Sequence, residues 1–274
     1  MIIDIYVNKS KDPNNIWVNK MISLAKSKDI SYRLISDSDL NSKTTSDALF
    51  VIGGDGTILN LTTYASNNRI PIVGFNAGKL GFLTEFEMDE IDEAFTMFKN
   101  SMLKKDVRTI ISASLNGNKF LALNDVVLQR ISIEERGNNI VSLDVFIDDN
   151  QVDKIIGDGV IISTPTGTTA YSLSAGGAIL APGINAFSVT PIAAHSFNQR
   201  PIVYSAQTKS LIKNVGDCKT GLFIDGIFAT SVQKDDVVEM TASDLPIIFL
   251  RKEGFNFYKR LSKKLKDRNG VNYD

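Results

Sequence analysis

The strongest candidate for a catalytic residue in this chain is Asp55. It is flanked by glycines in the run Gly53-Gly54-Asp55-Gly56. Glycine lacks a Cβ atom, so backbone N–H groups in this run can approach a ligand closely, and a helix opening just after them adds a positive dipole end. The turn should therefore hold phosphate. A carboxylate in such a cradle is electrostatically costly unless it accepts a proton from an attacking hydroxyl or holds a metal ion. Asp-Gly is also a common turn pair, so Asp55 could merely cap the helix.

A second candidate site is the run from Gly157 to Gly177, which places hydroxyls and glycines behind an apolar strand. Small side chains, O–H groups and accessible N–H groups suit a ligand that carries hydroxyls and phosphates. The run also holds the carboxylate Asp158 and one aromatic ring, Tyr171, which could stack on a base or belong to the core. The alternative is an ordinary Ser/Thr-rich loop.

A third candidate is the pair Asn124-Asp125, which interrupts an apolar run from Phe120 to Leu128. Two polar side chains inside an apolar strand need hydrogen-bond partners, and a ligand could supply them. A buried turn or a bulge would explain the pair equally well.

The elements around the glycine turn predict an α/β domain with a parallel sheet. The run Ala48–Ile52 is apolar throughout, as in a strand buried on both faces, and strands alternate with helices on both sides of it. Ligands of such sheets collect at the carboxyl ends of the strands, where Gly53–Thr57 would lie. A second such end, Gly74–Phe82, has glycines at a spacing that indicates only a loop with close backbone approach. The predicted elements are strands Met1–Val7, Ser31–Ile35, Ala48–Ile52 and Ile70–Gly74, and helices Ile16–Lys28, Ile58–Ala65 and Asp89–Lys99.

After Asn100 the pattern predicts a mostly antiparallel β domain. Short apolar runs follow one another with turn signals between them, and Asn116-Gly117 is a favoured hairpin pair. The last segment has apolar residues at helical spacing beneath a basic face and should pack back on the first domain. We expect domains at 1–100 and 101–253 and a returning helix in 254–274. The predicted strands are Thr109–Leu115, Lys119–Leu128, Ile140–Ile147, Gln151–Ile156, Gly159–Ser163, Pro201–Tyr204, Leu211–Val215, Gly221–Phe228 and Ile247–Arg251, and the helix is Phe255–Lys266.

Composition narrows the classes of partner. The 274 residues include 30 Lys and Arg against 31 Asp and Glu, so no basic footprint indicates nucleic acid or a membrane surface. One cysteine and one histidine rule out a thiolate cluster or a His-rich metal site. The first strand has a charge in its apolar run, unlike a signal peptide, and no segment could span a bilayer. We therefore expect a cytoplasmic protein.

With these motifs in hand, the chain resembles the bacterial NAD kinase family over nearly its whole length. Gly53–Thr57 looks like the catalytic motif of that family, and Asn124-Asp125 looks like its Asn-acidic motif. The run Gly157–Gly177 looks like its long glycine- and threonine-rich motif, and the part Thr164–Ser172 is specific to NAD kinases. Diacylglycerol kinases share the Gly-Gly-Asp-Gly turn within the same phosphofructokinase-like superfamily. The resemblance implies that fold for the first domain.

The activity implied is transfer of a phosphoryl group from ATP or polyphosphate to the 2′-hydroxyl of the adenosine ribose of NAD, giving NADP. Asp55 would be the general base. A divalent cation, most readily Mg²⁺, would neutralise negative charge on the phosphates and would be bound mainly by these phosphates, with few protein ligands. Asn124 and Asp125 would hold the ribose, and Asp158 would read a base or amide edge. The residues that the resemblance assigns to nucleotide binding are Gly56, Asn124, Asp125, Asp158, Thr169, Ala170, Tyr171, Ser172, Leu173, Ser174 and Ala193.

Two positions depart from the family pattern. The family more often has Glu where this chain has Asp125, and Ile156 replaces a basic residue found in some relatives, which leaves Lys154 or another subunit to contact the new phosphate. The resemblance also implies a homotetramer. Two rival functions share some of these features: a lipid kinase that uses the same glycine turn, and a regulator that binds NAD without chemistry. Against them stand the lack of a basic amphipathic membrane helix and the presence of Asp55.

Overall fold

The computed structural model describes residues 1–78, 81–131, 139–196 and 199–269. The chain forms two compact units: residues 1–107 together with 245–274 make the first, and residues 108–244 make the second. The first unit is thus built from both ends of the chain.

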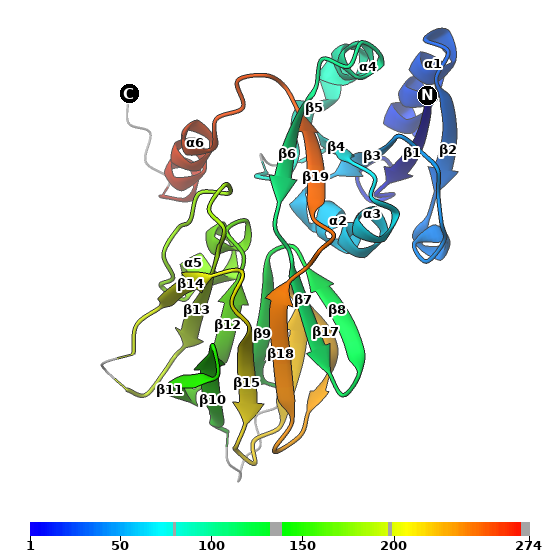
Figure 1. Ribbon diagram of the computed structural model, residues 1–274. Helices are drawn as coiled ribbons and strands as arrows, with labels where there is room; N and C mark the ends of the chain where they lie inside the picture. Colours follow the sequence, from blue (N-terminus) through cyan, green and yellow to red (C-terminus); the bar gives the residue numbers. More distant parts are fainter. Residues whose placement is uncertain (79–80, 132–138, 197–198, 270–274) are drawn as a thin grey trace. The chain divides into compact units, whose positions relative to one another are not determined.

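The first unit is organised around a mostly parallel sheet with the strand order β2-β1-β3-β4-β19-β6, to which β5 adds beside β4 (Figure 1). β3 (Ala48–Gly53) is buried at every position and pairs in parallel with β1 and β4. This burial on both faces explains its uninterrupted apolar sequence. The other strands are β1 (Ile2–Val7), β2 (Ser31–Ile35), β4 (Ile72–Asn76), β5 (Phe86–Glu87), β6 (Lys104–Arg108) and β19 (Ile247–Arg251).

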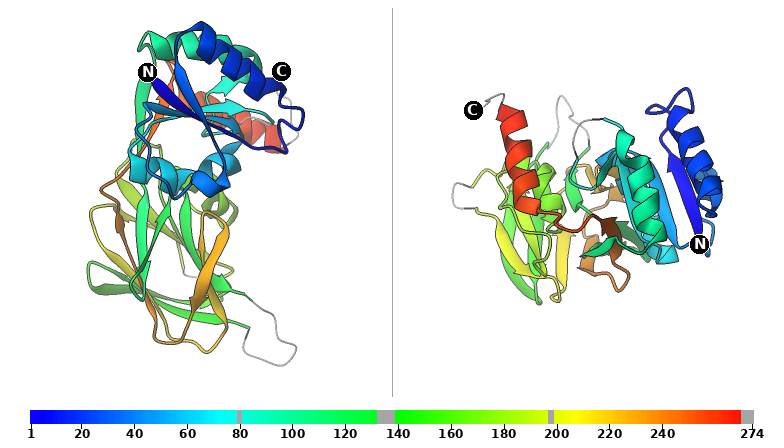
Figure 2. Two further views of the ribbon diagram at one scale, coloured as in Figure 1. Left: turned by 90° about the vertical axis from the view of Figure 1, so that its right-hand side faces the viewer. Right: turned by 90° about the horizontal axis from the view of Figure 1, so that it is seen from above.

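Helices cover both faces of this sheet. α1 (Ile16–Ser27) and α4 (Ile91–Lys99) lie side by side on one face, where Lys28 pairs with Asp92 at 2.8 Å (Figure 2). Their apolar residues join Phe50 and Phe75 in one core cluster. α2 (Asp55–Asn60) and α3 (Thr62–Asn68) lie on the other face. This division follows from right-handed crossovers, because the chain moves one way along the sheet from β1 to β2 and the other way from β3 to β4.

The second unit is a sandwich of two antiparallel sheets with the orders β11-β10-β15-β18-β7-β8 and β14-β13-β12-β9-β16-β17. Inward residues of both sheets form one apolar core, which includes Val126, Leu143 and Val160. The first sheet contains β7 (Ile111–Leu115), β8 (Asn118–Ala122), β10 (Val141–Ile147), β11 (Asn150–Gly157), β15 (Ser210–Asn214) and β18 (Val237–Ala242). The second contains β9 (Asp125–Arg130), β12 (Gly159–Ser163), β13 (Ala186–Ile192), β14 (Ile202–Ser205), β16 (Thr220–Ile224) and β17 (Ile227–Val232). The short helix α5 (Tyr171–Ser174) follows β12.

The predicted fold class is confirmed, including the returning C-terminal helix α6 (Phe257–Asn269), but several elements differ from the sequence-based expectation. Ile247–Arg251, expected among the strands of the second domain, is β19 and pairs in parallel with β4 in the first unit. The helix expected from Ile58 begins at Asp55 and is broken at Leu61. The strand expected over Gly221–Phe228 is a hairpin, because Asp225 and Gly226 both have positive φ and turn the chain. β5, β6, β13 and β18 were not predicted.

The apolar run Lys119–Leu128 is likewise two strands. β8 ends at Ala122 in one sheet and β9 begins at Asp125 in the other, so Leu123 and Asn124 carry the chain between the two layers of the sandwich. A change of sheet leaves backbone groups without ladder partners, which explains why polar residues interrupt the run here. Among the described residues, every helix is too short or too polar for a membrane crossing.

Candidate active site

The glycine turn holds Asp55 at the first position of α2, and a neighbouring loop fixes its side chain. The two carboxylate oxygens of Asp55 accept hydrogen bonds from the backbone N–H groups of Phe82 at 2.8 Å and Leu83 at 3.0 Å. A Cβ atom on Gly81 would lie 2.0 Å from one of these oxygens, so only glycine fits there. The loop after β4 therefore contributes directly to the site, beyond the close backbone approach that its sequence indicated.

The far side of the turn is fixed by Thr57. Its Oγ1 accepts hydrogen bonds from the side-chain amide of Asn8 at 3.0 Å and from the N–H of Gly54 at 3.4 Å. The same side chain lies against Gly53, where a Cβ atom would come within 2.4 Å of Thr57 Oγ1. Gly54 and Gly56, in contrast, face open space. Gly53 thus serves the turn itself, whereas Gly54 and Gly56 leave the backbone accessible.

The C-terminal helix supports the loop that holds Asp55. Arg260 of α6 donates to the carbonyl of Thr84 and lies 3.8 Å from a carboxylate oxygen of Glu85. Burial lowers the pKa of Arg260, and the charges of Glu85 and Asp55 partly offset this effect. Phe257 also packs against Phe82, with ring centroids 6.1 Å apart. One helix thus contacts the loop on either side of the backbone groups that bind Asp55.

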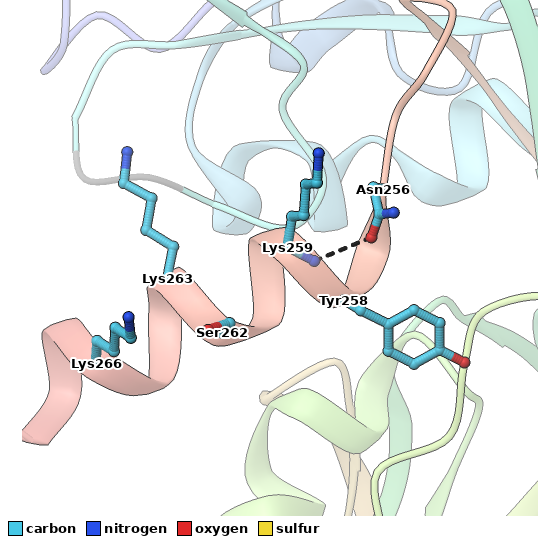
Figure 3. Close-up of a pocket in the computed structure, with 6 residues that line it drawn as sticks. All are labelled: Asn256, Tyr258, Lys259, Ser262, Lys263 and Lys266. Atoms are coloured by element: carbon cyan, nitrogen blue, oxygen red, sulfur yellow. Dashed lines mark hydrogen bonds between the residues drawn. The ribbon is translucent and has the colours of Figure 1, made fainter. Parts of the chain in front are cut away.

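The opposite face of α6 is basic and open. A shallow cavity there is lined by lysines, and the side chains of Lys259 and Lys263 extend in the same direction from the helix (Figure 3). Asn256 accepts a hydrogen bond from the N–H of Lys259 at 3.0 Å, which caps the helix. Tyr258 lines the same cavity and is 67% exposed. The lysines on this face contact solvent and have no part in holding Asp55.

In the second unit, the pair Asn124-Asp125 and the Thr/Gly run are built against each other. Thr164 donates its N–H to the carbonyl of Asn124 at 2.9 Å and its hydroxyl to the carbonyl of Leu123 at 2.5 Å. A Cβ atom on Gly167 would lie 2.0 Å from the carbonyl oxygen of Asn124. Among the described residues, nothing hydrogen-bonds to the side-chain amide of Asn124, which is therefore available to a ligand.

Asp225, which the sequence analysis did not identify, fixes the backbone on which Asn124 and Asp125 lie. Its carboxylate accepts hydrogen bonds from the N–H groups of Leu123, Asn124 and Asp125 at 2.9, 2.7 and 3.0 Å. Asp125 itself is only 4% exposed. Burial and then the charge of Asp225 raise the pKa of Asp125 to about 7, and burial raises the pKa of Asp225 to about 6. The two carboxyl groups therefore form an acidic pair that titrates near neutral pH.

Asp158 precedes β12 at the end opposite to Ser163, the residue that pairs with Asp125, and Ala193 follows β13 at the same end as Asp158. Asp158 forms a bidentate ion pair with Arg130, with N···O distances of 2.9 and 3.2 Å. Burial and the charges of Asp158 and Asp125 raise the pKa of Tyr171. Ala193 has a left-handed backbone, and its carbonyl lies 2.8 Å from the position of a Cβ atom on Gly157. Tyr171 therefore lies near Asp158, and Ala193 lies against Gly157, the neighbour of Asp158.

The run from Thr169 to Ser174 divides into inward and outward side chains. Thr169 and Ser172 are buried, with their hydroxyls bonded to the Thr166 carbonyl at 3.2 Å and to Thr190 Oγ1 at 3.1 Å. Tyr171 is 40% exposed, and Ser174 is exposed without a hydrogen-bond partner among the described residues. Ala170 and Leu173 are half-buried. Tyr171 is therefore not a core ring, and Tyr171 and Ser174 form the accessible part of the run.

One of the two positions that depart from the expected pattern, Ile156, lies on β11 together with Lys154. Lys154 and Ile156 are two residues apart in the strand and both are exposed, so they share one face of the sheet. The side chain of Lys154 is thus exposed beside that of Ile156.

Comparison with known proteins decides the family. Residues 7–102 match the model of the ATP-NAD kinase N-terminal domain, and residues 123–251 match that of the ATP-NAD kinase C-terminal domain. The chain belongs to the NAD kinase family. It is 33% identical to an NAD kinase of Fusobacterium nucleatum, over 96% of this chain and 97% of the relative, and 33% identical to an NAD kinase of Caldicellulosiruptor bescii, over 97% and 100%.

The fold of this NAD kinase family member is also that of a solved relative. The crystal structure of yeast NADH kinase complexed with NADH aligns with a TM-score of 0.82, covering 100% of this chain and 90% of that one, at 24% sequence identity. The resemblance drawn from the three motifs is confirmed, and the chain is an enzyme of the phosphotransferase class. A lipid kinase or a non-catalytic regulator is not favoured, because both NAD kinase domain models match along the chain.

Asp225 had a signal in the sequence that was overlooked. Asp225-Gly226 is a two-residue hairpin pair between apolar runs, which predicts a turn at this point. Nothing local in the sequence indicates that the carboxylate of this turn reaches Leu123, about a hundred residues away.

Proposed function

We propose that this NAD kinase family member transfers the γ-phosphoryl group of ATP to the 2′-hydroxyl of the adenosine ribose of NAD. The ribose oxygen forms a bond to the γ-phosphorus, the bond between that phosphorus and the β–γ bridging oxygen breaks, and ADP leaves. The hydroxyl proton passes to the carboxylate of Asp55. The products are NADP and ADP.

The observation that supports this proposal most strongly is that the backbone N–H groups of Phe82 and Leu83 donate hydrogen bonds to the Asp55 carboxylate. A helix cap bonds the N–H groups of its own helix, whereas Asp55 is bonded by a different loop. The carboxylate is therefore oriented at the end of β3, beside the open backbone of Gly54 and Gly56. A fixed carboxylate next to phosphate-binding N–H groups suits a general base in phosphoryl transfer.

The dinucleotide is assigned to the second unit. Asn124 offers an unpartnered amide to the adenosine ribose, and Asp125, buried beside Asp225, can accept a ribose hydroxyl directly or through a water. Tyr171 offers its exposed ring for stacking, and Ser174 offers a hydroxyl. Thr169 and Ser172 would act through their backbone, since both hydroxyls bind inside the fold.

The donor set fits a divalent cation held mainly through substrate. In the described part of the chain, no three His, Cys, Asp or Glu side chains group as a metal site, which suits Mg²⁺ because Mg²⁺ is commonly held by one or two carboxylates plus phosphates. Asp55 offers such a carboxylate. When bound, the ion would neutralise the charge of the transferring phosphoryl group. We further propose a cytoplasmic homo-oligomer, a tetramer by family resemblance.

The function is tested by incubating the purified chain with ATP, Mg²⁺ and NAD and measuring NADP with an NADP-specific dehydrogenase. We expect NADP in the complete mixture, and none when ATP, Mg²⁺ or NAD is left out. Saturable NAD binding without NADP formation would overturn the proposal in favour of a regulator. Transfer of label from ATP to diacylglycerol vesicles, with none to NAD, would overturn it in favour of a lipid kinase.

A further inference from the structure

A buried arginine that the proposed function does not use lies at the carboxyl end of β19. Arg251 is only 1% exposed, and its Cζ atom lies over the rings of Phe249 and Phe255, at 5.0 and 4.1 Å from their centroids. Its Nε donates to a carboxylate oxygen of Asp106 at 2.6 Å, and its Nη1 donates to Glu85 at 3.1 Å. A guanidinium is costly to bury without acceptors, and its planar fork matches them in one orientation only, so these contacts fix the side chain.

The third nitrogen of Arg251 contacts the loop that binds Asp55. Nη2 donates to the carbonyl of Phe82 at 3.2 Å. A peptide bond joins the carbonyl of one residue to the N–H of the next, so this carbonyl belongs to the same planar group as the N–H of Leu83. That N–H donates to Asp55 Oδ1 at 3.0 Å. The guanidinium and the carboxylate therefore lie at opposite ends of one peptide group.

This arrangement strengthens and directs the hydrogen bond to Asp55. A cation at the carbonyl end polarises the peptide group and makes its N–H a better donor, because hydrogen bonds in a chain reinforce one another. The cation also opposes rotation of the peptide plane. A rotated plane would aim the carbonyl oxygen at the carboxylate and would leave Nη2 without this acceptor, and an unpaired buried donor is costly.

The same side chain joins the loop to two strands of the sheet. Asp106 lies on β6, the neighbour of β19, and Glu85 lies directly before β5 and donates its N–H to the Gly74 carbonyl at 2.9 Å. These contacts alone would describe an ion-pair cluster that serves only stability. The hydrogen bond from Nη2 to the Phe82 carbonyl connects the cluster to Asp55.

We infer that Arg251 is a positioning residue for the general base and acts on Asp55 through the peptide group between Phe82 and Leu83. The inference rests on the proposed function, since it gives Arg251 a part in the turnover that Asp55 promotes. Arg260 supports the same loop at a different carbonyl, that of Thr84, so the two arginines act at separate points.

Steady-state kinetics of Arg251→Met and Arg251→Lys test this role. Methionine is a flexible apolar side chain without a charge or an N–H donor, whereas lysine keeps the charge but lacks the planar fork. In Arg251→Met we expect kcat to fall about tenfold or more with KM for NAD within about twofold of the parent, because the dinucleotide is assigned to the second unit. Arg251→Lys should have a kcat at least about threefold above that of Arg251→Met. A kcat for Arg251→Lys no higher than that of Arg251→Met would overturn the inference.

A second variant separates turnover from folding. Arg251→Met removes the cation beside Asp106, whereas Glu85 still has Arg260 at 3.8 Å. Combining Arg251→Met with Asp106→Asn removes the remaining negative charge, so the double variant should melt at a higher temperature than Arg251→Met and show the same low kcat. A double variant that regains the parental kcat would trace the loss to the carboxylate and would contradict the positioning role.

Arg33→Met is the matched control. It breaks another bidentate ion pair of the first unit, with the fully buried Asp4 at 2.9 and 3.0 Å. Asp4 contacts Ser46, which precedes β3, whereas Asp55 follows β3. We expect Arg33→Met to lower the melting temperature and to leave kcat of the folded enzyme within about twofold of the parent. Equal losses of kcat in Arg33→Met and Arg251→Met would assign Arg251 to stability alone.

Hydrogen exchange gives a readout that needs no turnover. Loss of Nη2 should speed exchange of the Leu83 N–H in Arg251→Met but not in Arg33→Met, which NMR of the full chain measures. If exchange is faster in Arg251→Met but the parent makes no NADP, the proposed function fails and the hold of Arg251 on the loop stands. If the parent makes NADP and Arg251→Met matches Arg33→Met in both exchange and kcat, the inference about Arg251 alone fails.

Discussion

Asp125 and Asp225 are joined by two reciprocal hydrogen bonds, one to a carboxylate and one to a backbone carbonyl. The N–H of Asp125 donates to the Asp225 carboxylate at 3.0 Å, and the N–H of Asp225 donates to the Asp125 carbonyl at 3.0 Å. The hairpin tip between β16 and β17 is thereby joined to the start of β9. The backbone of Asn124-Asp125 is thus fixed by a residue from a distant hairpin.

Removing this acceptor should damage the fold and binding together. Asp225→Ala leaves three N–H groups without their acceptor, and unsatisfied buried donors cost about 1–3 kcal/mol each, so we expect a loss of at least about 3 kcal/mol in the free energy of unfolding. KM for NAD should rise with it. Urea denaturation and steady-state kinetics measure both effects. Asp217→Ala, at an exposed ion pair of the same unit, is the control and should change neither quantity appreciably.

The acidic pair should make stability depend on pH. The pKa of Asp125 is about 7 in the folded chain against an ordinary value of 3.8, so the folded state holds this proton more tightly than the unfolded state. The stabilisation is complete below about pH 4 and is lost as the pH rises through about 7.

Asp125→Asn cannot ionise, so the stability of this variant should fall less between pH 5 and pH 8. At pH 8 we expect it to exceed the parent by about 1–3 kcal/mol, even though its NAD affinity falls. Thermal melts across this pH range measure the slope. The control Asp149→Asn replaces an exposed carboxylate in a turn whose left-handed backbone suits Asn. A slope for Asp125→Asn as steep as that of the control would contradict the shifted pKa.

The catalytic role of Asp55 is tested by Asp55→Asn. The amide preserves the shape of the side chain but cannot take a proton, so kcat should fall about 10²–10⁴-fold while NAD still binds. The melting temperature should stay close to that of the parent. Asp89→Asn, at an exposed position of the same unit, controls for loss of one negative charge. Near-normal turnover of Asp55→Asn would mean that Asp55 only caps the helix or positions a metal ion.

Tyr171 should act on binding more than on chemistry. Stacking on a base is present in the ground state and the transition state alike, so Tyr171→Ala should raise KM for NAD about 5- to 150-fold and spare kcat. Because the ring is 40% exposed, its loss should leave the melting temperature nearly unchanged. Tyr171→Phe should change little, since the hydroxyl makes only a 3.3 Å contact with Gln129. A sharply lowered melting temperature with unchanged KM would assign the ring to the core.

Arg260 should act on turnover through the loop that binds Asp55. Arg260→Ala removes the donor to the Thr84 carbonyl and loosens the Phe82 and Leu83 N–H groups, so kcat should fall about tenfold or more, with a smaller change in KM for NAD. Arg260→Lys should recover part of kcat. Lys263→Ala, on the exposed face of the same helix, is the control. Identical kcat values for Arg260→Ala and Lys263→Ala would show that α6 does not position the base.

By itself, the sequence determined the chemical motifs and the class of fold. Three glycines around Asp55, the polar pair at Asn124 and the hydroxyl-rich run each depart from their apolar surroundings, so they could be identified without any contact. The alternation of strands and helices before Asn100, and the short runs after it, distinguished a parallel sheet from an antiparallel sandwich. These signals are local, because side-chain periodicity is set by the geometry of one element.

Only the tertiary structure decided which distant residues complete each motif. Asp55 is bound by N–H groups 27 and 28 residues away, and Asn124 by a carboxylate 101 residues away. β19, expected in the second domain, joins the first sheet beside β4. Pairings of this kind leave no period in the sequence, because backbone donors are the same for every residue except proline and the partner is chosen by packing. The fold therefore selected Asp225, Gly81 and Arg260, whose roles no local pattern could have shown.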